Sequence, residues 1–396
     1  MTHQSATYPP VDRTLHNSIK HFHVRTALIL LAAAFASQMT AQSQECPQGG
    51  WRYDLNGLPL DIPIDQNELV KVELGKTEVE NPISSTVTAL NCSAGALRFS
   101  ALYPDFGPFT VSPFQGGPDL TQPIPRSLAV RLLVAFRPSD PGKGTGSMRI
   151  NGRAFGLTGL GLLPADVISL IPEGTVEPRQ QLRIRLMIRR SFTKPLTGDI
   201  ELRFRAEGQD NQVDDPAIQF NQNGRKMSFF LAEGKTEAEF SSTGTQLIVQ
   251  TGTVAGTIEL PITFYADQEV VSSANQPIKS LKIETAAPSI VDAKITRQGT
   301  SFDLVIVAFS TLREITNIGL LVNPSAGSRI SQDVGSLDPV NTKRAFDAYY
   351  NTTGKVFGGL FQVTIRGTVS GDLSAVASMT ITMGNTKGTV QKTIPF

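Results

Sequence analysis

Histidine is confined to the first 23 residues of this chain, at His3, His16, His21 and His23. The rest of the chain therefore cannot form a Ser-His-Asp or Cys-His nucleophile system. It also cannot supply imidazole ligands to a zinc or copper ion. Glycoside hydrolysis needs only two carboxylates, so the lack of histidine leaves that reaction open.

Cysteine is scarce, because the sequence contains only Cys46 and Cys92. Two cysteines this far apart do not have the ligand spacing of a zinc knuckle. In an exported protein an even pair favours a disulfide. Closing a loop of this length would stabilise the fold by about 4 kcal/mol in the chain-entropy model. The alternative is a pair of buried free thiols.

The chain also lacks an excess of basic residues. Its formal net charge is +1, whereas polyanion-binding domains are usually clearly basic, so we expect no nucleic-acid partner. The sequence contains no GxxxxGK[ST] phosphate loop, and we interpret the glycine-rich segment Gly142–Gly146 as a hairpin turn. We expect no cofactor.

No apolar run is long enough to cross a membrane. The run Ala27–Ala36 is short, whereas a spanning helix needs about 20 residues. Arg13, Lys20 and Arg25 precede it, which is typical of a signal peptide over residues 1–41. A buried N-terminal helix is the alternative. Cleavage would remove every histidine, three basic residues and one acidic residue, and would change the net charge to −1. The predicted location is secreted, periplasmic or cell-surface, with no transmembrane segment left.

Helical periodicity is absent after residue 41, whereas alternation of apolar and polar residues is frequent. Examples are Leu182–Ile188, Ile200–Phe204 and Phe361–Ile365. Together with 34 glycines and 25 prolines, this pattern predicts an all-β protein of several sandwiches. One helical turn is expected at Lys343–Tyr350, too short to carry a core.

The first predicted module covers residues 51–161 and contains a recognisable pattern at both ends. The segments that carry it are Val72–Lys76, Val87–Asn91, Leu133–Pro138, Gly146–Gly152 and Leu157–Gly161. They resemble the ASH/HYDIN-like immunoglobulin-like domains, including those of bacterial "choice-of-anchor D" proteins. The resemblance implies an immunoglobulin-like β-sandwich. It does not extend to Cys92, so the disulfide is not implied by it.

The end of this pattern predicts a hairpin. Phe136 would close one strand, Pro138 and Gly142 would form the turn, and Gly146–Ile150 would be the returning strand.

Two further β-sandwiches are predicted at residues 166–284 and 288–396. They resemble a two-module tail that occurs in predicted secreted proteins of soil bacteria and has no established activity. Linkers are expected at Leu163-Pro164 and Thr285–Pro288. The predicted fold is therefore all-β, with three tandem immunoglobulin-like β-sandwich domains after a signal peptide.

Arg183, Arg185, Arg203 and Arg205 alternate with apolar residues in two neighbouring predicted strands. If these strands pair as a hairpin, the four arginines share one outer face. Local acids such as Glu201 would then offset the repulsion, or an anionic ligand such as an acidic polysaccharide would.

An acidic cluster falls within nine residues, and its members are Glu207, Asp210, Asn211, Asp214 and Asp215. Oxygen ligands in a loop suit Ca²⁺, although the spacing is not that of an EF-hand. The alternative is a set of solvated turn carboxylates. No other metal site is expected.

Four aromatic residues lie outside clean strand patterns, namely Trp51, Tyr53, Tyr349 and Tyr350. They are candidates for a glycan-binding platform or for packing within and between modules.

These patterns predict a secreted or cell-surface scaffold or adhesion protein that is not an enzyme. The alternatives are a module that binds an extracellular glycan or other polymer and, more distantly, a carboxylate-dependent glycoside hydrolase. Partners would be extracellular polysaccharides or surface proteins.

Overall fold

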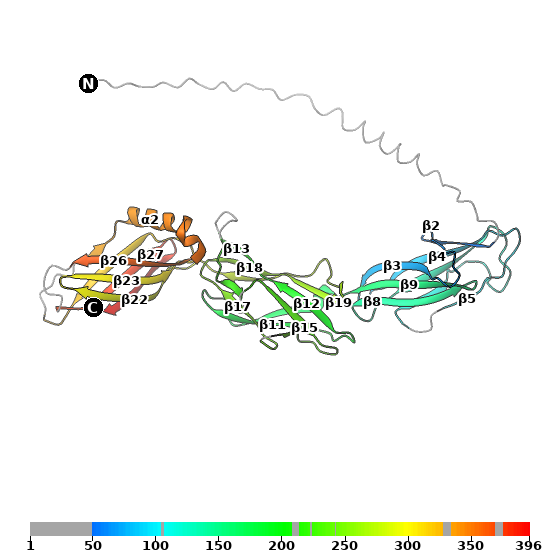
Figure 1. Ribbon diagram of the computed structural model, residues 1–396, viewed down its shortest axis with the longest axis horizontal. Coiled ribbons are helices and arrows are strands. Elements are labelled where there is room, and N and C mark those ends of the chain that lie inside the picture. Colours follow the sequence, from blue (N-terminus) through cyan, green and yellow to red (C-terminus); the bar gives the residue numbers. More distant parts are fainter. Residues whose placement is uncertain are drawn as a thin grey trace, which may run out of the picture.

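The computed structural model describes residues 50–103, 107–207, 214–221, 224–241, 243–327, 334–368 and 375–396. Three β-sheet modules follow one another along the long axis of the molecule, with one helix, α2, beside the last of them (Figure 1). None of the helices in these ranges is long and apolar enough to span a membrane. The predicted signal peptide, residues 1–41, lies outside the described residues and stays a prediction.

The first module is built from two facing sheets, with the strand orders β2-β1-β4-β7-β6 and β3-β9-β8-β5. Strand β3 pairs with β9 in parallel, and the other pairs are antiparallel. The strands are β1 (Trp51–Leu55), β2 (Leu58–Pro59), β3 (Val70–Glu78), β4 (Ile83–Asn91), β5 (Ala101–Leu102), β6 (Phe109–Pro113), β7 (Ala129–Phe136), β8 (Gly142–Ile150) and β9 (Arg153–Leu162).

The hairpin predicted around Pro138 and Gly142 is wrong. Strand β7 pairs with β4 and β6, whereas β8 pairs with β9 and β5, so the chain crosses here from one sheet to the other. Gly142–Gly146 is therefore strand rather than turn. A Cβ on Gly144 would lie 2.6 Å from the buried Phe136 ring, so the glycine leaves room for that ring in the core.

The actual hairpin of this region joins β8 to β9. Its two turn residues are Asn151 and Gly152, with φ of 52° and 83°. Two consecutive residues with positive φ are typical of a type I′ turn, for which Asn-Gly is the preferred pair. The Asn-Gly dipeptide is a hairpin signal that was present in the sequence.

The second module contains three sheets, with the orders β10-β11-β17-β14, β16-β15-β12-β19-β20 and β13-β18-β21. The strands are β10 (Ile168–Glu173), β11 (Gln181–Ile188), β12 (Leu196–Glu201), β13 (Arg203–Ala206), β14 (Ile218–Phe220), β15 (Lys226–Leu231), β16 (Glu239–Phe240), β17 (Leu247–Thr251), β18 (Gly256–Leu260), β19 (Ile262–Ala266), β20 (Glu269–Val270) and β21 (Lys279–Ile283), and a short 3-10 helix, η1 (Ala165–Val167), precedes them.

Pro261 separates two of these sheets. It lies between β18 and β19, and it has no N–H to continue the ladder. Its carbonyl accepts a hydrogen bond from Glu201 N at 3.0 Å, opposite the break between β12 and β13. One long pair of strands is thereby divided between two sheets.

The third module contains two sheets, with the orders β22-β23-β26 and β25-β24-β27-β28. Its elements are β22 (Ser289–Gln298), β23 (Ser301–Phe309), β24 (Asn317–Pro324), β25 (Val334–Ser336), α2 (Pro339–Asn351), the 3-10 helix η2 (Thr353–Phe357), β26 (Leu360–Thr368), β27 (Val376–Asn385) and β28 (Gly388–Pro395).

Helix α2 is longer than the single turn predicted at Lys343–Tyr350, and it does contribute to a core. Asp338 caps its N-terminus, where the carboxylate accepts a hydrogen bond from Val340 N at 3.0 Å, and Pro339 occupies the first turn. Phe346 and Tyr350 are buried in the hydrophobic cluster of the third module. The Asp-Pro pair is a helix-start signal that could have predicted this length.

Each module has its own hydrophobic cluster, centred on residues such as Leu132, Phe264 and Ile381. The alternation of buried and exposed residues along most strands produces these clusters, since side chains alternate across a strand. The prediction of a mostly β protein with several sheets in tandem is confirmed. The module boundaries 51–161, 166–284 and 288–396 stay predictions.

Candidate functional site at the module joints

The contact between the first and second modules, which we call the first joint, has an apolar centre. Val79 and Leu163, at the ends of β3 and β9, are buried in the hydrophobic cluster of the second module. Leu163 N also donates a hydrogen bond to Val271 O at 2.7 Å. The first module therefore contributes directly to the core of the second.

A polar rim surrounds this centre. The Ser273 hydroxyl donates to Glu78 Oε1 at 2.9 Å, and Thr193 N donates to Asp140 Oδ1 at 2.6 Å. Lys194 Nζ donates across the joint to Lys143 O at 3.3 Å, and it also pairs with Asp267 of its own module at 3.0 Å. Most of these groups remain in contact with solvent, so each contributes little to stability by itself.

Glu80 is the most connected residue of the rim. Its carboxylate lies 2.7 Å from an Arg190 nitrogen and 3.3 Å from an Arg137 nitrogen. The hydrogen bond and charge of Arg190, followed by the contribution of Arg137, hold the pKa of Glu80 below its ordinary value. The Glu80 side chain is 48% exposed, so salt screens these pairs.

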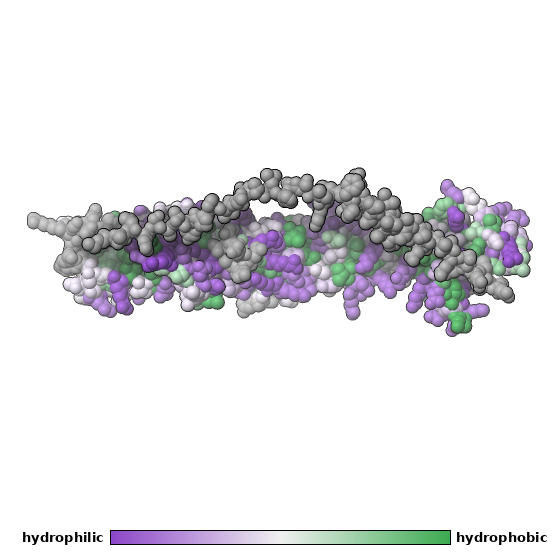
Figure 2. Space-filling view, turned by 90° about the horizontal axis from the view of Figure 1, so that it is seen from above, coloured by the Kyte–Doolittle hydropathy of each residue, from purple (hydrophilic) through white to green (hydrophobic). Residues whose placement is uncertain are grey.

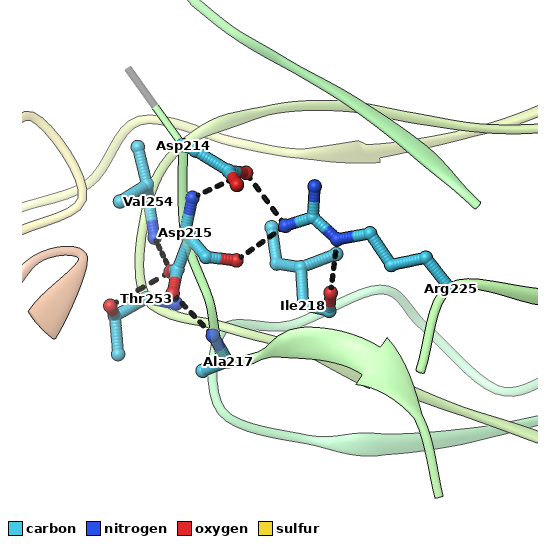
Figure 3. Close-up of polar contacts among 7 residues, drawn as sticks. All are labelled: Asp214, Asp215, Ala217, Ile218, Arg225, Thr253 and Val254. Atoms are coloured by element: carbon cyan, nitrogen blue, oxygen red, sulfur yellow. Dashed lines mark hydrogen bonds and ion pairs between the residues drawn. The ribbon is translucent and has the colours of Figure 1, made fainter. Parts of the chain in front are cut away.

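The contact between the second and third modules, the second joint, is centred on a fully buried carboxylate. Asp215 is 0% exposed. Figure 3 shows the groups that surround its carboxylate. Its Oδ2 accepts hydrogen bonds from Thr253 N at 2.5 Å, the Thr253 hydroxyl at 3.0 Å and Val254 N at 3.0 Å. Its Oδ1 accepts one from Ala217 N at 3.0 Å. A buried carboxylate needs such donors, and here both oxygens have them.

The network continues from Thr253 into the third module. The Thr253 hydroxyl accepts a hydrogen bond from Gly359 N at 2.7 Å, and nearby Ala255 N donates to Thr311 O at 2.9 Å. A Cβ on Gly358 would lie 2.6 Å from the Asp215 carboxylate, and φ of Gly358 is +61°. Glycine at this position lets the backbone approach the buried acid.

On the third-module side, Arg313 is buried, with 8% exposure, and its guanidinium donates to the Tyr350 carbonyl. Burial lowers the pKa of Arg313 below its ordinary value, and the nearby charge of Asp215 opposes this shift. The Tyr350 hydroxyl donates to Gly359 O at 2.9 Å, and burial raises the pKa of Tyr350. Helix α2 is thereby connected to the glycine that bonds to Thr253.

The linker between these modules is also held by hydrogen bonds. Asn385 Nδ2 donates to Ala286 O at 2.9 Å and to Ser310 Oγ at 3.2 Å. Ala286 N donates to the Thr311 hydroxyl at 2.9 Å. The linker predicted at Thr285–Pro288 is thus tied to the third module.

Two of the candidate calcium ligands, Asp214 and Asp215, form hydrogen bonds within the protein. Asp214 accepts a hydrogen bond from Arg225 at 2.6 Å (Figure 3), and Asp215 organises the second joint. Asp210 and Asn211 lie outside the described residues. Glu207 N bonds to Ala255 O. Within the described ranges, no group of three or more His, Cys, Asp or Glu residues could hold a metal ion.

The two arginine-bearing strands do not pair as a hairpin, so the condition for a shared arginine face is not met. Arg183 and Arg185 lie on β11, which pairs with β10 and β17, whereas Arg203 and Arg205 lie on β13, which pairs with β18. The four side chains therefore do not form one stripe across a hairpin. Alternation indicated which face each strand buries, but it could not identify the neighbouring strand.

Local acids partner three of these arginines. Arg185 lies 3.3 Å from Glu173, and Arg203 lies 2.9 Å from Glu201. Arg205 lies 3.0 Å from Glu259. The fourth, Arg183, is directly opposite Glu173 in the register of β10 and β11. The geometry therefore favours the interpretation that nearby carboxylates offset the arginine charges, rather than the interpretation that the four arginines share one anionic ligand.

Cys92 is buried, and its N–H donates to Gly50 O at 2.9 Å. This contact brings the chain four residues after Cys46 beside Cys92. Cys46 itself lies outside the described residues, so the disulfide stays a prediction, to be tested by peptide mapping without reduction.

The four aromatic candidates pack against protein. Tyr53 meets the Phe155 ring edge-on at 5.0 Å, and Trp51 meets the Phe99 ring at 5.7 Å. Tyr349 and Tyr350 both donate hydroxyl hydrogen bonds to the backbone next to η2, at Leu360 O and Gly359 O. Packing is the interpretation that the structure favours for all four.

Most residues of the second joint, including Thr253, Arg313, Gly358 and Gly359, are not among the sites predicted from the sequence. The adjacent glycines were the available signal, because a glycine pair after a short helical pattern marks a close backbone approach. Asp215 was noticed, but as a candidate calcium ligand.

No family model and no curated protein matches this chain. Solved structures do match, at low sequence identity. Yersinia pseudotuberculosis adhesin InvE has 10% identity over 61% of this chain and 64% of its own length, with a TM-score of 0.24. The full mouse nectin-like molecule 4 ectodomain (Ig1–Ig3) has 10% identity over 82% and 96%, with a TM-score of 0.27. Chicken CNTN1 FN1–FN3 has 7% identity over 81% and 98%, with a TM-score of 0.19.

Proposed function

We propose that this chain is an exported, non-catalytic scaffold that holds its three modules in a fixed extended arrangement at or beyond the cell surface. The observation that carries the proposal is the second joint, where a fully buried carboxylate is satisfied by donors on one module next to the backbone of the other. Buried hydrogen-bonded networks specify one geometry, because any other leaves polar groups unpaired.

The first joint supports the same proposal by a different route. Val79 and Leu163 are shared with the second core, so rotation about this joint would expose apolar surface. Inter-domain contacts are ordinarily mobile unless they are large or tightly packed. Two stiff joints in series favour a spacer or adhesion role, for which reach and orientation matter.

The lack of catalysis is part of the proposal. Its support is the absence of histidine after residue 23 and the engagement of Asp214 and Asp215 in structural bonds. A first module of the ASH/HYDIN-like kind, in an exported protein with polysaccharide or protein partners, agrees with this role.

The test compares two substitutions at Thr253. Thr253→Val keeps the shape but removes the hydroxyl that accepts from Gly359 N, whereas Thr253→Ser keeps it. In small-angle X-ray scattering of the exported chain, we expect wild type and Thr253→Ser to fit one extended conformation. Thr253→Val should broaden the distribution of interatomic distances and shorten the mean end-to-end length.

A wild-type profile that requires an ensemble of bent conformations would overturn the proposal. So would identical profiles for wild type and Thr253→Val, because the Gly359 bond would then not hold the joint.

A further inference from the structure

A pocket of about 320 Å³ opens on the surface at the second joint. Arg179, Gln181 and Gln250 line it from the second module, and Phe357 and Leu360 line it from the third. Its size is at the lower end of small-molecule sites. Because both modules form its walls, the pocket exists only while the joint is closed.

A row of three glutamines leads into this pocket. Gln181 on β11 is directly opposite Gln250 on β17, which is directly opposite Gln219 on β14. Directly opposed residues point to the same face, and the sequence neighbours of each glutamine, such as Leu182 and Val249, are buried. The three amides therefore share the outer face of the sheet.

These amides are available to a ligand. Within the described residues, none of the side chains of Gln181, Gln219 and Gln250 is hydrogen-bonded to protein. Each amide offers a carbonyl acceptor and two N–H donors in one plane. A row of such groups matches a chain of hydroxyls, which also donate and accept.

Phe357 places an exposed ring beside the amides. It is 55% exposed at the end of η2, although large apolar side chains are usually covered. Figure 2 shows hydrophilic and hydrophobic residues interspersed along the visible side of the molecule, so a single exposed ring is not unusual by itself. The Phe357 ring is notable because it lines the same pocket as Gln181 and Gln250. An aromatic face beside amides suits the apolar C–H face of a sugar ring.

Arg179 adds a positive charge to the pocket. Its φ is +60°, a conformation that is uncommon for a residue other than glycine, and its N–H bonds to Gly252 O at 2.6 Å. The guanidinium lies 5.7 Å from the centroid of the Phe309 ring of the third module, and it forms no ion pair within the described residues. It is therefore available to a carboxylate, which a guanidinium fork binds well.

We propose that this pocket binds an acidic saccharide of the hexuronate class, with the glutamine row on its hydroxyls, Phe357 on one sugar ring and Arg179 on a carboxylate. The proposal rests on the proposed function, since the closed joint forms the pocket. Binding in turn stabilises the closed joint, because the ligand contacts both modules and binds the open state less well.

The experiment is calorimetric titration of the exported chain with tetragalacturonate and, as the neutral control, cellotetraose. We expect tetragalacturonate to bind more tightly than cellotetraose. Gln250→Leu and Phe357→Ala should each weaken tetragalacturonate binding by about tenfold. Gln298→Leu makes the same chemical change on an exposed residue at the far end of β22 and should bind as wild type does.

Three results would overturn the assignment. They are the absence of tetragalacturonate binding, equal affinity of wild type and Gln250→Leu, and equal affinity for an oligoglutamate peptide of the same charge. The last would indicate an acidic polypeptide as the ligand class.

Scattering of the same variants separates this proposal from the scaffold. If wild type has the extended scattering profile but does not bind tetragalacturonate, only the proposal of a saccharide site is wrong. If wild type binds tetragalacturonate but its scattering requires bent conformations, the proposal of a fixed arrangement is wrong. We further expect Thr253→Val to lose both the extended profile and affinity, whereas Gln250→Leu loses affinity alone.

Discussion

The two joints of this molecule hold neighbouring modules by different physical means. At the first joint, Val79 and Leu163 enter the core of the second module, and exposed ion pairs such as Glu80 with Arg190 surround them. At the second joint, the centre is polar and buried, with Asp215 and Thr253 bonding to backbone groups. Apolar burial tolerates small rotations, whereas a buried hydrogen-bond network does not.

The consequence is a different sensitivity at each joint. The rim of the first joint responds to salt and pH, because its charges are solvated. The second joint responds to the loss of single atoms, because Asp215 and the Thr253 and Val254 groups that donate to it are buried. Four comparisons test this difference, from the largest expected effect to the smallest.

Added methyl groups should damage the second joint most. A Cβ on Gly359 would lie 2.4 Å from Ser310 O and 2.8 Å from Thr253 O, and backbone atoms cannot move aside. We expect Gly359→Ala to destabilise the protein by about 3–4 kcal/mol. At the first joint, Gly142→Ala meets Ala266 Cβ at 3.1 Å with φ of +109°, and we expect about 1–2 kcal/mol from that strain.

Chemical unfolding of both glycine variants measures these values. A larger loss for Gly142→Ala than for Gly359→Ala would reverse the ranking of the joints.

Removal of one carboxylate from each joint should also have unequal effects. Asp215→Ala leaves buried N–H groups of Thr253 and Val254 without an acceptor, and we expect a loss of about 3 kcal/mol. Glu80→Ala removes exposed pairs and should leave the unfolding midpoint unchanged. Similar shifts of the unfolding midpoint for the two variants would contradict the claim that only the second joint depends on a buried carboxylate.

The two joints should respond differently to salt concentration. Raising the salt concentration screens Glu80, Arg137 and Arg190, so the first joint should bend more, whereas the buried bonds of the second should not change. Distance measurements between labels placed on neighbouring modules follow each joint. Equal broadening at both joints would show that solvent reaches the Asp215 network.

Acid, like added salt, should increase bending at the first joint, and this is the smallest of the four expected effects. Because Arg190 lowers the pKa of Glu80 in the folded protein, the contribution of Glu80 is present above its ordinary value of 4.5. It is lost as the pH falls through the lowered pKa. The distance distribution across the first joint should broaden over this pH range, and Glu80→Gln should remove the dependence. A wild-type response identical to that of Glu80→Gln would exclude Glu80 as its origin.

Part of this architecture could be predicted from local signals. Alternation in Leu182–Ile188 and Ile200–Phe204 correctly indicated strands with buried Leu182, Ile184 and Ile200. The same alternation left the pairing of these strands open, because strand partners depend on long-range contacts that a single strand does not record. The turn predicted at Gly142–Gly146 failed for a related reason. Glycine there serves the packing of Phe136, which lies in the opposite sheet.

The sequence by itself determined the composition of the cores and the classes of chemistry that this chain lacks. Alternation of apolar and polar residues places one apolar face on each strand. No histidine occurs after residue 23, so that part of the chain has no imidazole for catalysis or metal binding. Only the tertiary structure decided the meaning of Asp215. An acid in a polar loop has the same local sequence whether it binds water, a metal ion or a buried backbone. The approach of Thr253 and Gly359, from segments far apart in the chain, makes it the centre of a joint.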